Sequence, residues 1–434
     1  MGRDAGGAGD PRCVGEEDAS LMTSDEVNRS PGEGDELDVT IDSVAFGGDG
    51  VARVGGYVIF VPDVIPGERV RIAVTASKRS YGRGVVVRIL EASADRVDPR
   101  CPVYGTCGGC QYQHVSYARS LDLKARQLRE VASRIGGLAI DEVCDAVSPA
   151  PAAYGYRSAV SLRVRKTGHI LEAGYSARDN TTFVPISRCP IASAQINDVL
   201  ARVDSILSRH EHPDSIDRVS VKSAGGETLV YPHHRGPFRS PQYEVLVYRL
   251  GRLIFHFGAT TFFQVNHDMI PVLLDVVAEG LSPDIGETLF DLYAGVGLFS
   301  IGFAERYGHV FGIESGSEAV TCFQENIRAN SLTNVTAIRG RVETKIAGAL
   351  SEMEGKRVSV VVDPPRTGMT DDVVRFLMDA PIDKLVYVSC DPATLARDLK
   401  PLVACYTLRK MTPLDLFPQT KHLETVAVLE RPTS

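Results

Sequence analysis

The sequence predicts an α/β protein whose last part, residues 256–434, forms a mostly parallel sheet covered by helices on both faces. Short apolar runs rich in β-branched residues, TLFDLYA, HVFGIE, VSVVVDPP and KLVYVSC, alternate there with helix-like stretches such as SGSEAVTCFQENIRANS. This alternation is typical of βαβ units, whose strands are buried on both faces. A series of short alternating strands nearer the N-terminus predicts a separate β-rich module before this sheet.

Composition is that of a multidomain globular protein. The 434 residues correspond to about three domains. The apolar share of 44% and charged share of 24% are average. No uncharged apolar stretch is long enough to span a membrane, and the N-terminus lacks the pattern of a secretory signal. We therefore expect a cytoplasmic protein, and we expect a monomer.

The N-terminal part divides into a tail and a barrel. Residues 1–35 are rich in Gly, Asp, Glu and Ser and predict a disordered tail. Residues 36–95 predict a small β-barrel, with strands separated by turns such as FGGDG and IPGE. The net charge of -8 conceals a local strip of six basic residues without an acid: Arg69, Arg71, Lys78, Arg79, Arg83 and Arg88. The strip favours RNA binding over a barrel that only packs on its neighbour, because phosphate contacts need Lys and Arg.

Residues 96–255 predict a mixed α+β central domain. A helical stretch near residues 117–135 has apolar positions at three- and four-residue steps, and we expect it to pack on the domain of residues 256–434. Three cysteines, Cys101, Cys107 and Cys110, can surround one metal centre, and Cys189 before Pro190 can supply a fourth thiolate. The spacing alone leaves an iron–sulfur cluster and structural zinc both open.

A glycine motif, Asp-x-x-x-Gly-x-Gly, follows the first strand of the parallel sheet. Gly295 and Gly297 would let the backbone turn tightly and approach a ligand. Glu314 ends the next strand, where an acid bonds ribose hydroxyls. Asp363 follows a later strand, and the prolines after it would place it at the carboxyl edge of the sheet. Without a third glycine for a pyrophosphate, the pattern favours S-adenosylmethionine over a dinucleotide, with a plain βα turn as the alternative.

Cys390 ends the run KLVYVSC, at the edge where open parallel sheets have their active sites. Adding a thiolate to carbon 6 of a uracil makes carbon 5 nucleophilic enough to attack a sulfonium methyl group. A base must then remove the proton from carbon 5 before the thiol can leave. Glu424, before the apolar run TVAVL, is the candidate base, although its position alone also fits an exposed carboxylate at a strand edge.

Six motifs in this order resemble one family. CPVYGTCGGCQYQH, FFQVN, DLYAGVGLF, DPPRTG, VSCDPATLARDL and LFPQTKHLETV are together similar to the RNA uracil-5 methyltransferases, over residues 38–430. The subgroup that it resembles has an N-terminal TRAM barrel and a 4Fe–4S cluster, and modifies mainly 23S ribosomal RNA.

The resemblance implies a class I, Rossmann-like S-adenosylmethionine-dependent methyltransferase domain at residues 256–434, with a TRAM barrel (OB-like) at 36–95 and the cluster in the central domain. It implies that Cys390 is the nucleophile and Glu424 the base. The implied ligands of S-adenosylmethionine are Gln264, Tyr293, Glu314 and Asp363, and those of the 4Fe–4S cluster are Cys101, Cys107, Cys110 and Cys189. Carbon 6 cannot be reached in a stacked helix, so the target uridine is expected to be flipped out.

The chain departs from the family pattern at three positions. Ala294 stands where members often have Cys, Leu298 where they often have Asn, and Arg341 where they commonly have Asp or Asn. These departures weaken a cofactor role for Leu298 and Arg341 but leave the expected chemistry intact.

Three alternatives remain open at this stage. The uridine could lie in the T-loop of transfer RNA. A radical S-adenosylmethionine methylthiotransferase also combines a TRAM domain with a cluster, but it needs Cys-x3-Cys-x2-Cys, whereas this chain has five residues between Cys101 and Cys107. A non-catalytic RNA-binding or ribosome assembly factor could keep the same scaffold, although the positions of Cys390 and Glu424 are both filled.

Overall fold

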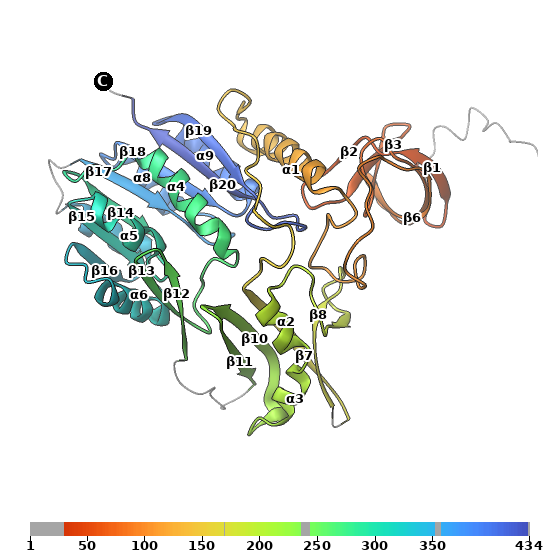
Figure 1. Cartoon of the computed structure of the whole chain (residues 1–434). Helices are drawn as coiled ribbons and strands as arrows, with labels where there is room; N and C mark the ends of the chain where they lie inside the picture. Colours follow the sequence, from red (N-terminus) through yellow and green to blue (C-terminus); the bar gives the residue numbers. More distant parts are fainter. Residues whose placement is uncertain (1–29, 169, 236–243, 352–356, 433–434) are drawn as a thin grey trace, which may run out of the picture.

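The structure is a computed structural model that describes residues 30–168, 170–235, 244–351 and 357–432. Figure 1 shows the N-terminal barrel, a central sheet and a larger α/β part at the C-terminal end. Of the tail predicted at residues 1–35, residues 1–29 lie outside the described part. The N–H of Gly34 donates to the carbonyl of Val74 at 2.8 Å, so the chain just before the first strand already contacts the barrel.

The barrel is a curled six-stranded sheet with the order β1-β5-β6-β4-β3-β2. Every pair is antiparallel except β4 with β6. In β5 the side chains alternate, so Val70 and Ile72 enter the core while Arg69 and Arg71 face outward. The strands are β1 (Glu36–Thr40), β2 (Ser43–Val44), β3 (Gly50–Val54), β4 (Tyr57–Val61), β5 (Arg69–Ser77) and β6 (Tyr81–Glu91).

Ion pairs reduce the free charge of the predicted basic strip. Three of its six cations contact carboxylates that lie elsewhere in the sequence: Arg69 with Glu91, Arg71 with Asp38 and Arg83 with Asp49, at 2.7–3.1 Å. The strip contains no acid along the chain, but strand pairing brings acids from other strands beside it. Within the described part of the chain, Lys78, Arg79 and Arg88 have no such carboxylate partner.

Helix α1 (Tyr117–Val131) connects the barrel with the rest of the molecule (Figure 1). The Ser116 side chain caps its first turn by accepting from the N–H of Arg119 at 3.4 Å. A π-helical turn, η2 (Ala132–Gly136), ends it and packs against α9. Leu128 and Ala132 belong to the same hydrophobic core as the C-terminal sheet, so α1 packs on that part of the molecule.

The central domain is an antiparallel sheet with two short helices on it. Its order is β11-β10-β7-β8-β9, and Val160, Leu162, Val219 and Val221 form the middle of its core. The elements are β7 (Ala159–Thr167), β8 (Ile170–Ser176), β9 (Phe183–Pro185), α2 (Ala194–Leu200), α3 (Val203–Ser208), η3 (Pro213–Ser215), β10 (Ile216–Ala224) and β11 (Glu227–His234).

A separate hairpin follows, made of β12 (Val245–Leu250) and β13 (Leu253–Gly258). The predicted boundary between residues 255 and 256 falls inside β13. The hairpin is bound to helix α6 (Ser317–Ala329), because Asn326 Oδ1 accepts from the N–H of His256 at 2.6 Å and Asn330 Oδ1 from the N–H of Ile254 at 2.9 Å. It therefore packs with the C-terminal domain.

The C-terminal sheet confirms the predicted α/β class. Its order is β16-β15-β14-β17-β18-β20-β19, parallel from β16 to β18, with β20 antiparallel to both of its neighbours. The strands are β14 (Thr288–Leu292), β15 (His309–Glu314), β16 (Val335–Arg339), β17 (Val358–Val362), β18 (Lys384–Ser389), β19 (Thr407–Leu414) and β20 (Glu424–Glu430).

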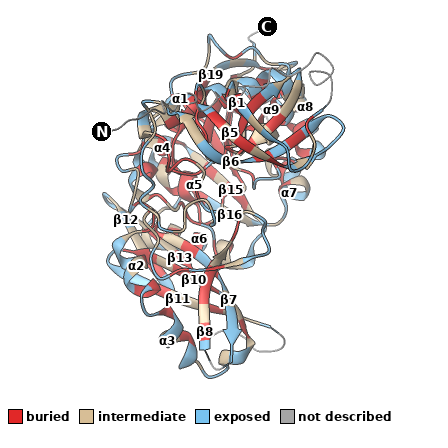
Figure 2. Cartoon of the chain, turned by 90° about the vertical axis from the view of Figure 1, so that its right-hand side faces the viewer, coloured by how far each residue is buried: buried red, intermediate tan, exposed pale blue. Residues whose placement is uncertain are grey.

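Helices cover this sheet on both faces, and its middle strands β14 and β17 are buried along their whole length. Figure 2 views the molecule from the barrel side, so the barrel strands β1, β5 and β6 lie in front of this sheet. One core forms against α4 and α5, and the other against α8 and α9. The remaining elements are η4 (His267–Met269), α4 (Ile270–Leu281), α5 (Leu298–Phe303), η5 (Ala304–Arg306), α7 (Val342–Ser351), α8 (Asp371–Asp379) and α9 (Pro392–Leu402). The strand order reverses between β14 and β17, which is where ligands bind in open α/β sheets. No helix among the described residues is long and apolar enough to cross a membrane.

Candidate active site

A cavity of about 620 Å³ lies at the carboxyl ends of the parallel strands. It gathers all but one of the predicted catalytic and cofactor residues, although they come from distant parts of the sequence. Its wall includes Gln264, Tyr293, Gly295, Glu314, Asp363, Cys390 and Glu424. Parallel strands end at one edge of a sheet, so the loops after β14, β15, β17 and β18 meet there.

The turn after β14 contains two glycines with left-handed backbone, one that lines the cavity and one that allows a helix to pack closely. Gly295, at φ 58°, lies on the cavity wall. Gly297, at φ 89°, is outside the set of lining residues, and a Cβ there would lie 2.3 Å from the ring of Phe323 on α6. A Cβ at Gly312 of β15 would also lie 2.3 Å from this ring. Gly297 therefore allows α6 to pack close to the sheet, a role that differs from the predicted approach to a ligand.

Glu314 connects two loops at the cavity edge. Its Oε2 accepts from the N–H of Gly295 at 2.9 Å, and its Oε1 accepts from the N–H of Gly316 at 2.5 Å. The carboxylate is thus oriented by backbone groups from the β14 and β15 loops, in the position where ribose hydroxyls are bound in nucleoside-binding sheets.

Two carboxyl groups, Asp291 and Asp363, lie close enough for the charge of one to affect the other, and Asp363 lines the cavity. Asp291 of β14 accepts from the N–H and Oγ of Ser300 at 2.9 and 2.7 Å, and burial raises its pKa to about 6. Burial, followed by the charge of Asp291, also raises the pKa of Asp363. One of these groups is therefore readily held neutral, which allows it to donate a hydrogen bond.

Cys390 and Glu424 come from neighbouring strand ends, because Ser389 pairs with Thr425 in the β18–β20 ladder. Burial raises the pKa of the Cys390 thiol to about 12, with further contributions from Glu424 and Asp363, while Arg366 lowers it by hydrogen bonding and charge. Glu424 is 2% exposed, and burial and Asp363 raise its pKa well above the usual range. Arg366 opposes both shifts, because its charge favours the ionised form of Cys390 and of Glu424.

Several cavity residues had no role in the sequence prediction. Arg157, Phe262 and Phe417 line the wall, and Leu298 and Arg341 do so despite their departure from the family pattern. Arg366 stands in the DPPR motif, which marked its place but not its effect on the pKa of Cys390. Phe417 stands in the LFPQTKHLETV motif, which marked its place. No local sequence signal distinguishes Arg157, which enters the wall only through tertiary packing.

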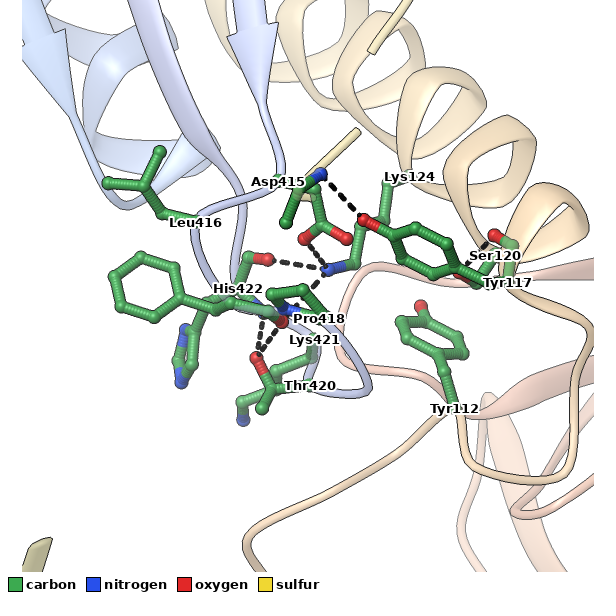
Figure 3. Close-up of polar contacts among 12 residues, drawn as sticks. Tyr112, Tyr117, Ser120, Lys124, Asp415, Leu416, Pro418, Thr420, Lys421 and His422 are labelled. Atoms are coloured by element: carbon green, nitrogen blue, oxygen red, sulfur yellow. Dashed lines mark hydrogen bonds and ion pairs between the residues drawn. The ribbon is translucent and has the colours of Figure 1, made fainter. Parts of the chain in front are cut away.

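The β19–β20 loop (residues 415–423) contributes Phe417 to the cavity wall and is tied to helix α1. Lys124 Nζ donates to Asp415 Oδ1 at 2.6 Å, to the carbonyl of His422 at 2.9 Å and to that of Phe417 at 3.3 Å. Figure 3 shows the lysine reaching from α1 into the curve of the loop. The N–H groups of Gln111 and Tyr112 also donate to one carbonyl of this loop, at 2.9 and 3.0 Å.

The four predicted cluster cysteines line one further cavity of about 340 Å³, together with Gly108 and Gly109. Burial raises the pKa of Cys107, Cys110 and Cys189, and the charges of neighbouring cysteine thiolates add to each shift. In the described part of the chain, no three His, Cys, Asp or Glu side chains are arranged so as to hold a metal ion as they stand. The cysteine cavity shares Arg157, Arg366 and Phe417 with the catalytic cavity.

Comparisons with known proteins agree with this architecture. The family described as tRNA (Uracil-5-)-methyltransferase matches residues 243–432, and the TRAM domain matches residues 32–87. An uncharacterised RNA methyltransferase of Halalkalibacterium halodurans is 32% identical over 91% of this chain and 97% of the relative. Another, from Gloeobacter violaceus, is 31% identical over 92% and 97%.

A solved structure is similar over nearly its whole length. It is the Pyrococcus abyssi tRNA (uracil-54, C5)-methyltransferase in complex with S-adenosyl-L-homocysteine, with a TM-score of 0.69 and 25% identity, covering 90% of this chain and 99% of that one. The similarity includes the barrel, the central sheet and the C-terminal domain together, so it extends to the arrangement of all three.

Proposed function

The chain belongs to the RNA uracil-5 methyltransferase family and uses S-adenosylmethionine, and we propose that it methylates its uridine through a covalent adduct between Cys390 and carbon 6. Because the chain belongs to this family, its substrate is an RNA and it is an enzyme. The non-catalytic RNA-binding factor considered from the sequence is therefore not favoured. The observation that carries the covalent route is the placement of Cys390 and Glu424 on one cavity wall with Asp363 and Arg366.

In this mechanism Cys390 first gives its thiol proton to water, and Arg366 favours this step because its charge and hydrogen bond stabilise the thiolate. The sulfur then bonds carbon 6, and the electron pair of the carbon 5–carbon 6 double bond moves into an enolate. When bound, S-adenosylmethionine supplies a methyl group to carbon 5. Glu424, as a carboxylate, next takes the proton from carbon 5, the double bond re-forms and the carbon 6–sulfur bond breaks to return the thiolate.

We assign cofactor binding to further residues that line the same cavity. Glu314 would bond the ribose hydroxyls, and Gly295 would let the backbone lie close to the cofactor. Tyr293, Gln264 and Asp363 complete this part of the wall. Gly297 would act indirectly, through the packing of α6. A uridine stacked in a helix could not reach Cys390 at the cavity wall, so the target base is proposed to be flipped out.

A 4Fe–4S cluster on Cys101, Cys107, Cys110 and Cys189 is proposed for the cysteine cavity. The donor set supports it: four half-buried or buried thiols line one hollow, each close enough to influence the charge of others. Cys189 is held by Asn197, whose Oδ1 accepts from its N–H at 2.8 Å. Four thiolates suit zinc as well, so metal analysis of the intact protein decides between them.

We propose 23S ribosomal RNA as the substrate, because the TRAM barrel together with a cysteine cluster resembles the subgroup that modifies it. Transfer RNA is a second candidate, favoured by the similarity to the Pyrococcus abyssi enzyme, which is a tRNA (uracil-54, C5)-methyltransferase. A cytoplasmic location and a monomeric state stay predictions.

Tritium release tests the reaction and the substrate together. RNA carrying 5-tritiated uridine, ribosomal and transfer RNA separately, is incubated with the purified enzyme and S-adenosylmethionine. Release from one RNA that is lost in Cys390→Ala, with RNA affinity retained, supports carbon-5 methylation through Cys390. Cys322→Ala is the matched control, since Cys322 is buried outside the cavity. No release from either RNA with the cofactor bound would overturn the proposed reaction.

A further inference from the structure

A third hollow, an open groove of about 600 Å³, lies outside both cavities. It runs between the segment after the barrel, the start of α1 and the β19–β20 loop. Arg100, Tyr117, Tyr154 and Gln419 are among its lining residues, and none of its residues lines the catalytic or the cysteine cavity. The proposed reaction gives this groove no role.

Gln419 is an unusual residue in this wall. Gln419 is only 3% exposed, and its side-chain oxygen Oε1 has no hydrogen-bond partner among the residues that the structure describes. Its backbone is left-handed, at φ 69°, which is strained for a residue other than glycine. A buried acceptor without a donor is costly and rare, so it indicates a donor that is bound only part of the time.

Another part of the groove wall presents a cation stacked on an aromatic ring. The Arg100 guanidinium lies 4.3 Å from the centre of the Tyr154 ring, and Arg100 is exposed with no ion pair in the described part of the chain. Guanidinium and phenol faces are the surfaces on which nucleobases stack. Asp98 also lines the groove, so a phosphate would meet an acid there. The groove therefore favours a base over a phosphate.

The groove is close to the catalytic cavity through one loop. Phe417 lines the catalytic cavity and Gln419 lines the groove, and two residues span at most about 7 Å of chain. The loop is fixed between them, because the Gln419 carbonyl accepts two backbone N–H groups and Lys124 binds the Phe417 carbonyl. An RNA whose target base enters the cavity passes near the groove.

We propose that this groove binds an unpaired nucleotide of the RNA substrate near the target uridine, with its base against the Arg100–Tyr154 pair and an N–H of the base donating to Gln419 Oε1. The proposal rests on the proposed function, because it requires RNA at the catalytic cavity. Adenine, cytosine, guanine and uracil all carry an N–H that can donate to this acceptor. The groove therefore distinguishes an unpaired base at this position from a paired one, and does not distinguish among the four bases. It thereby contributes to the choice of the RNA site.

The test uses fluorescein-labelled ribosomal RNA and transfer RNA with the full-length enzyme at fixed salt. Gln419→Met removes the acceptor in a side chain of similar shape, and Arg100→Gln removes an exposed cation without entering the core. Each is expected to weaken RNA binding at least fivefold in anisotropy titrations. The thermal midpoint of Gln419→Met should be unchanged or higher, since an unpaired buried acceptor is lost. Gln324→Met and Arg375→Gln, on exposed faces of α6 and α8, are the controls.

The outcomes separate the groove from the reaction. Affinities of both groove variants within twofold of the wild type would overturn the proposal, as would a Gln419→Met variant that is destabilised, because Oε1 would then have a partner within the protein. Tritium release by the wild-type enzyme is measured on the same RNAs. If no tritium is released while the groove variants still bind RNA more weakly, the proposed reaction is contradicted and the proposed role of the groove in RNA binding is supported.

Discussion

Lys124 and Asp415 form a buried ion pair between residues 291 positions apart, with Nζ 2.6 Å from Oδ1 and side chains 1% and 0% exposed. Burial lowers the pKa of Lys124, whereas Asp415 raises it. The lysine also binds two carbonyls of the loop that ends at Glu424 (Figure 3). The pair thus ties the helix after the barrel to one wall of the catalytic cavity.

Lys124→Met is expected to destabilise the protein by about 3–5 kcal/mol, because it leaves Asp415 buried without its cation. Urea denaturation measures the loss. Adding Asp415→Leu should restore much of it, since removing both charges avoids the unpaired carboxylate. Lys410→Met, which breaks an exposed contact with Glu279, should cost about 1 kcal/mol or less. Equal losses in Lys124→Met and Lys410→Met would contradict the importance of the buried pair.

Glu424→Gln is expected to trap the covalent adduct. Methyl transfer precedes the removal of the carbon-5 proton, so loss of the base should lower tritium release by at least about 10²-fold while enzyme bonded to methylated RNA accumulates. Denaturing gels with a labelled methyl group detect the adduct. Glu430→Gln, at the other end of β20, is the control. A Gln variant that releases tritium at the wild-type rate would remove Glu424 from the mechanism.

Cys390 is expected to react slowly with iodoacetamide in the absence of RNA. A pKa raised to about 12, mainly by burial, leaves on the order of a thousandfold less thiolate at neutral pH than an ordinary cysteine. The rate should rise about tenfold per pH unit from pH 7 to 9 and fall further in Arg366→Gln. Mass spectrometry of the Cys390 peptide, compared with urea-unfolded protein, measures it. A plateau below pH 8 would mean that the thiol is already ionised.

Much of the catalytic cavity could be predicted because its residues stand directly after strands. Cys390, Asp363 and Glu314 follow short apolar runs, and parallel strands bring such positions to one edge. Arg157 carries no such local signal, and Phe417 is marked only by its place in the LFPQTKHLETV motif. They reach the wall through packing between distant segments, as Lys124 and Asp415 do, and one sequence does not reveal those contacts.

In the barrel, the order of charges along the sequence does not predict which cations are free on the folded surface. Arg71 belongs to a run without acids, yet Asp38 accepts from it at 2.7 Å because β1 pairs with β5. A basic strip in one strand therefore overstates the free charge of the folded surface. Strand pairing, which depends on the whole sheet, decides which cations remain available for phosphate.

Cys189→Ala is expected to lower the iron content of anaerobically purified enzyme, because Cys189 lines the cysteine cavity with the other three thiols. Cys322→Ala should retain the wild-type content, since Cys322 is buried in a different core. Iron, zinc and sulfide are measured per chain in both variants. Equal iron in the two would reject Cys189 as a ligand, and zinc without sulfide would replace the proposed cluster with a structural zinc site.

The contribution of Glu424 to the stability of the protein should fall as pH rises. Burial and Asp363 raise the pKa of Glu424 in the folded state, so the folded protein binds a proton there that the unfolded chain loses above its ordinary value of 4.5. This contribution is complete below pH 4.5 and is lost as pH rises toward the folded pKa, by up to about 1.4 kcal/mol per unit for one proton. Glu424→Gln removes the linkage, so its stability relative to the wild type should increase from pH 5 to pH 8 in urea denaturation. Glu430→Gln should show no such trend, and a constant difference between Glu424→Gln and the wild type would mean that Glu424 is ionised in the folded enzyme throughout this range.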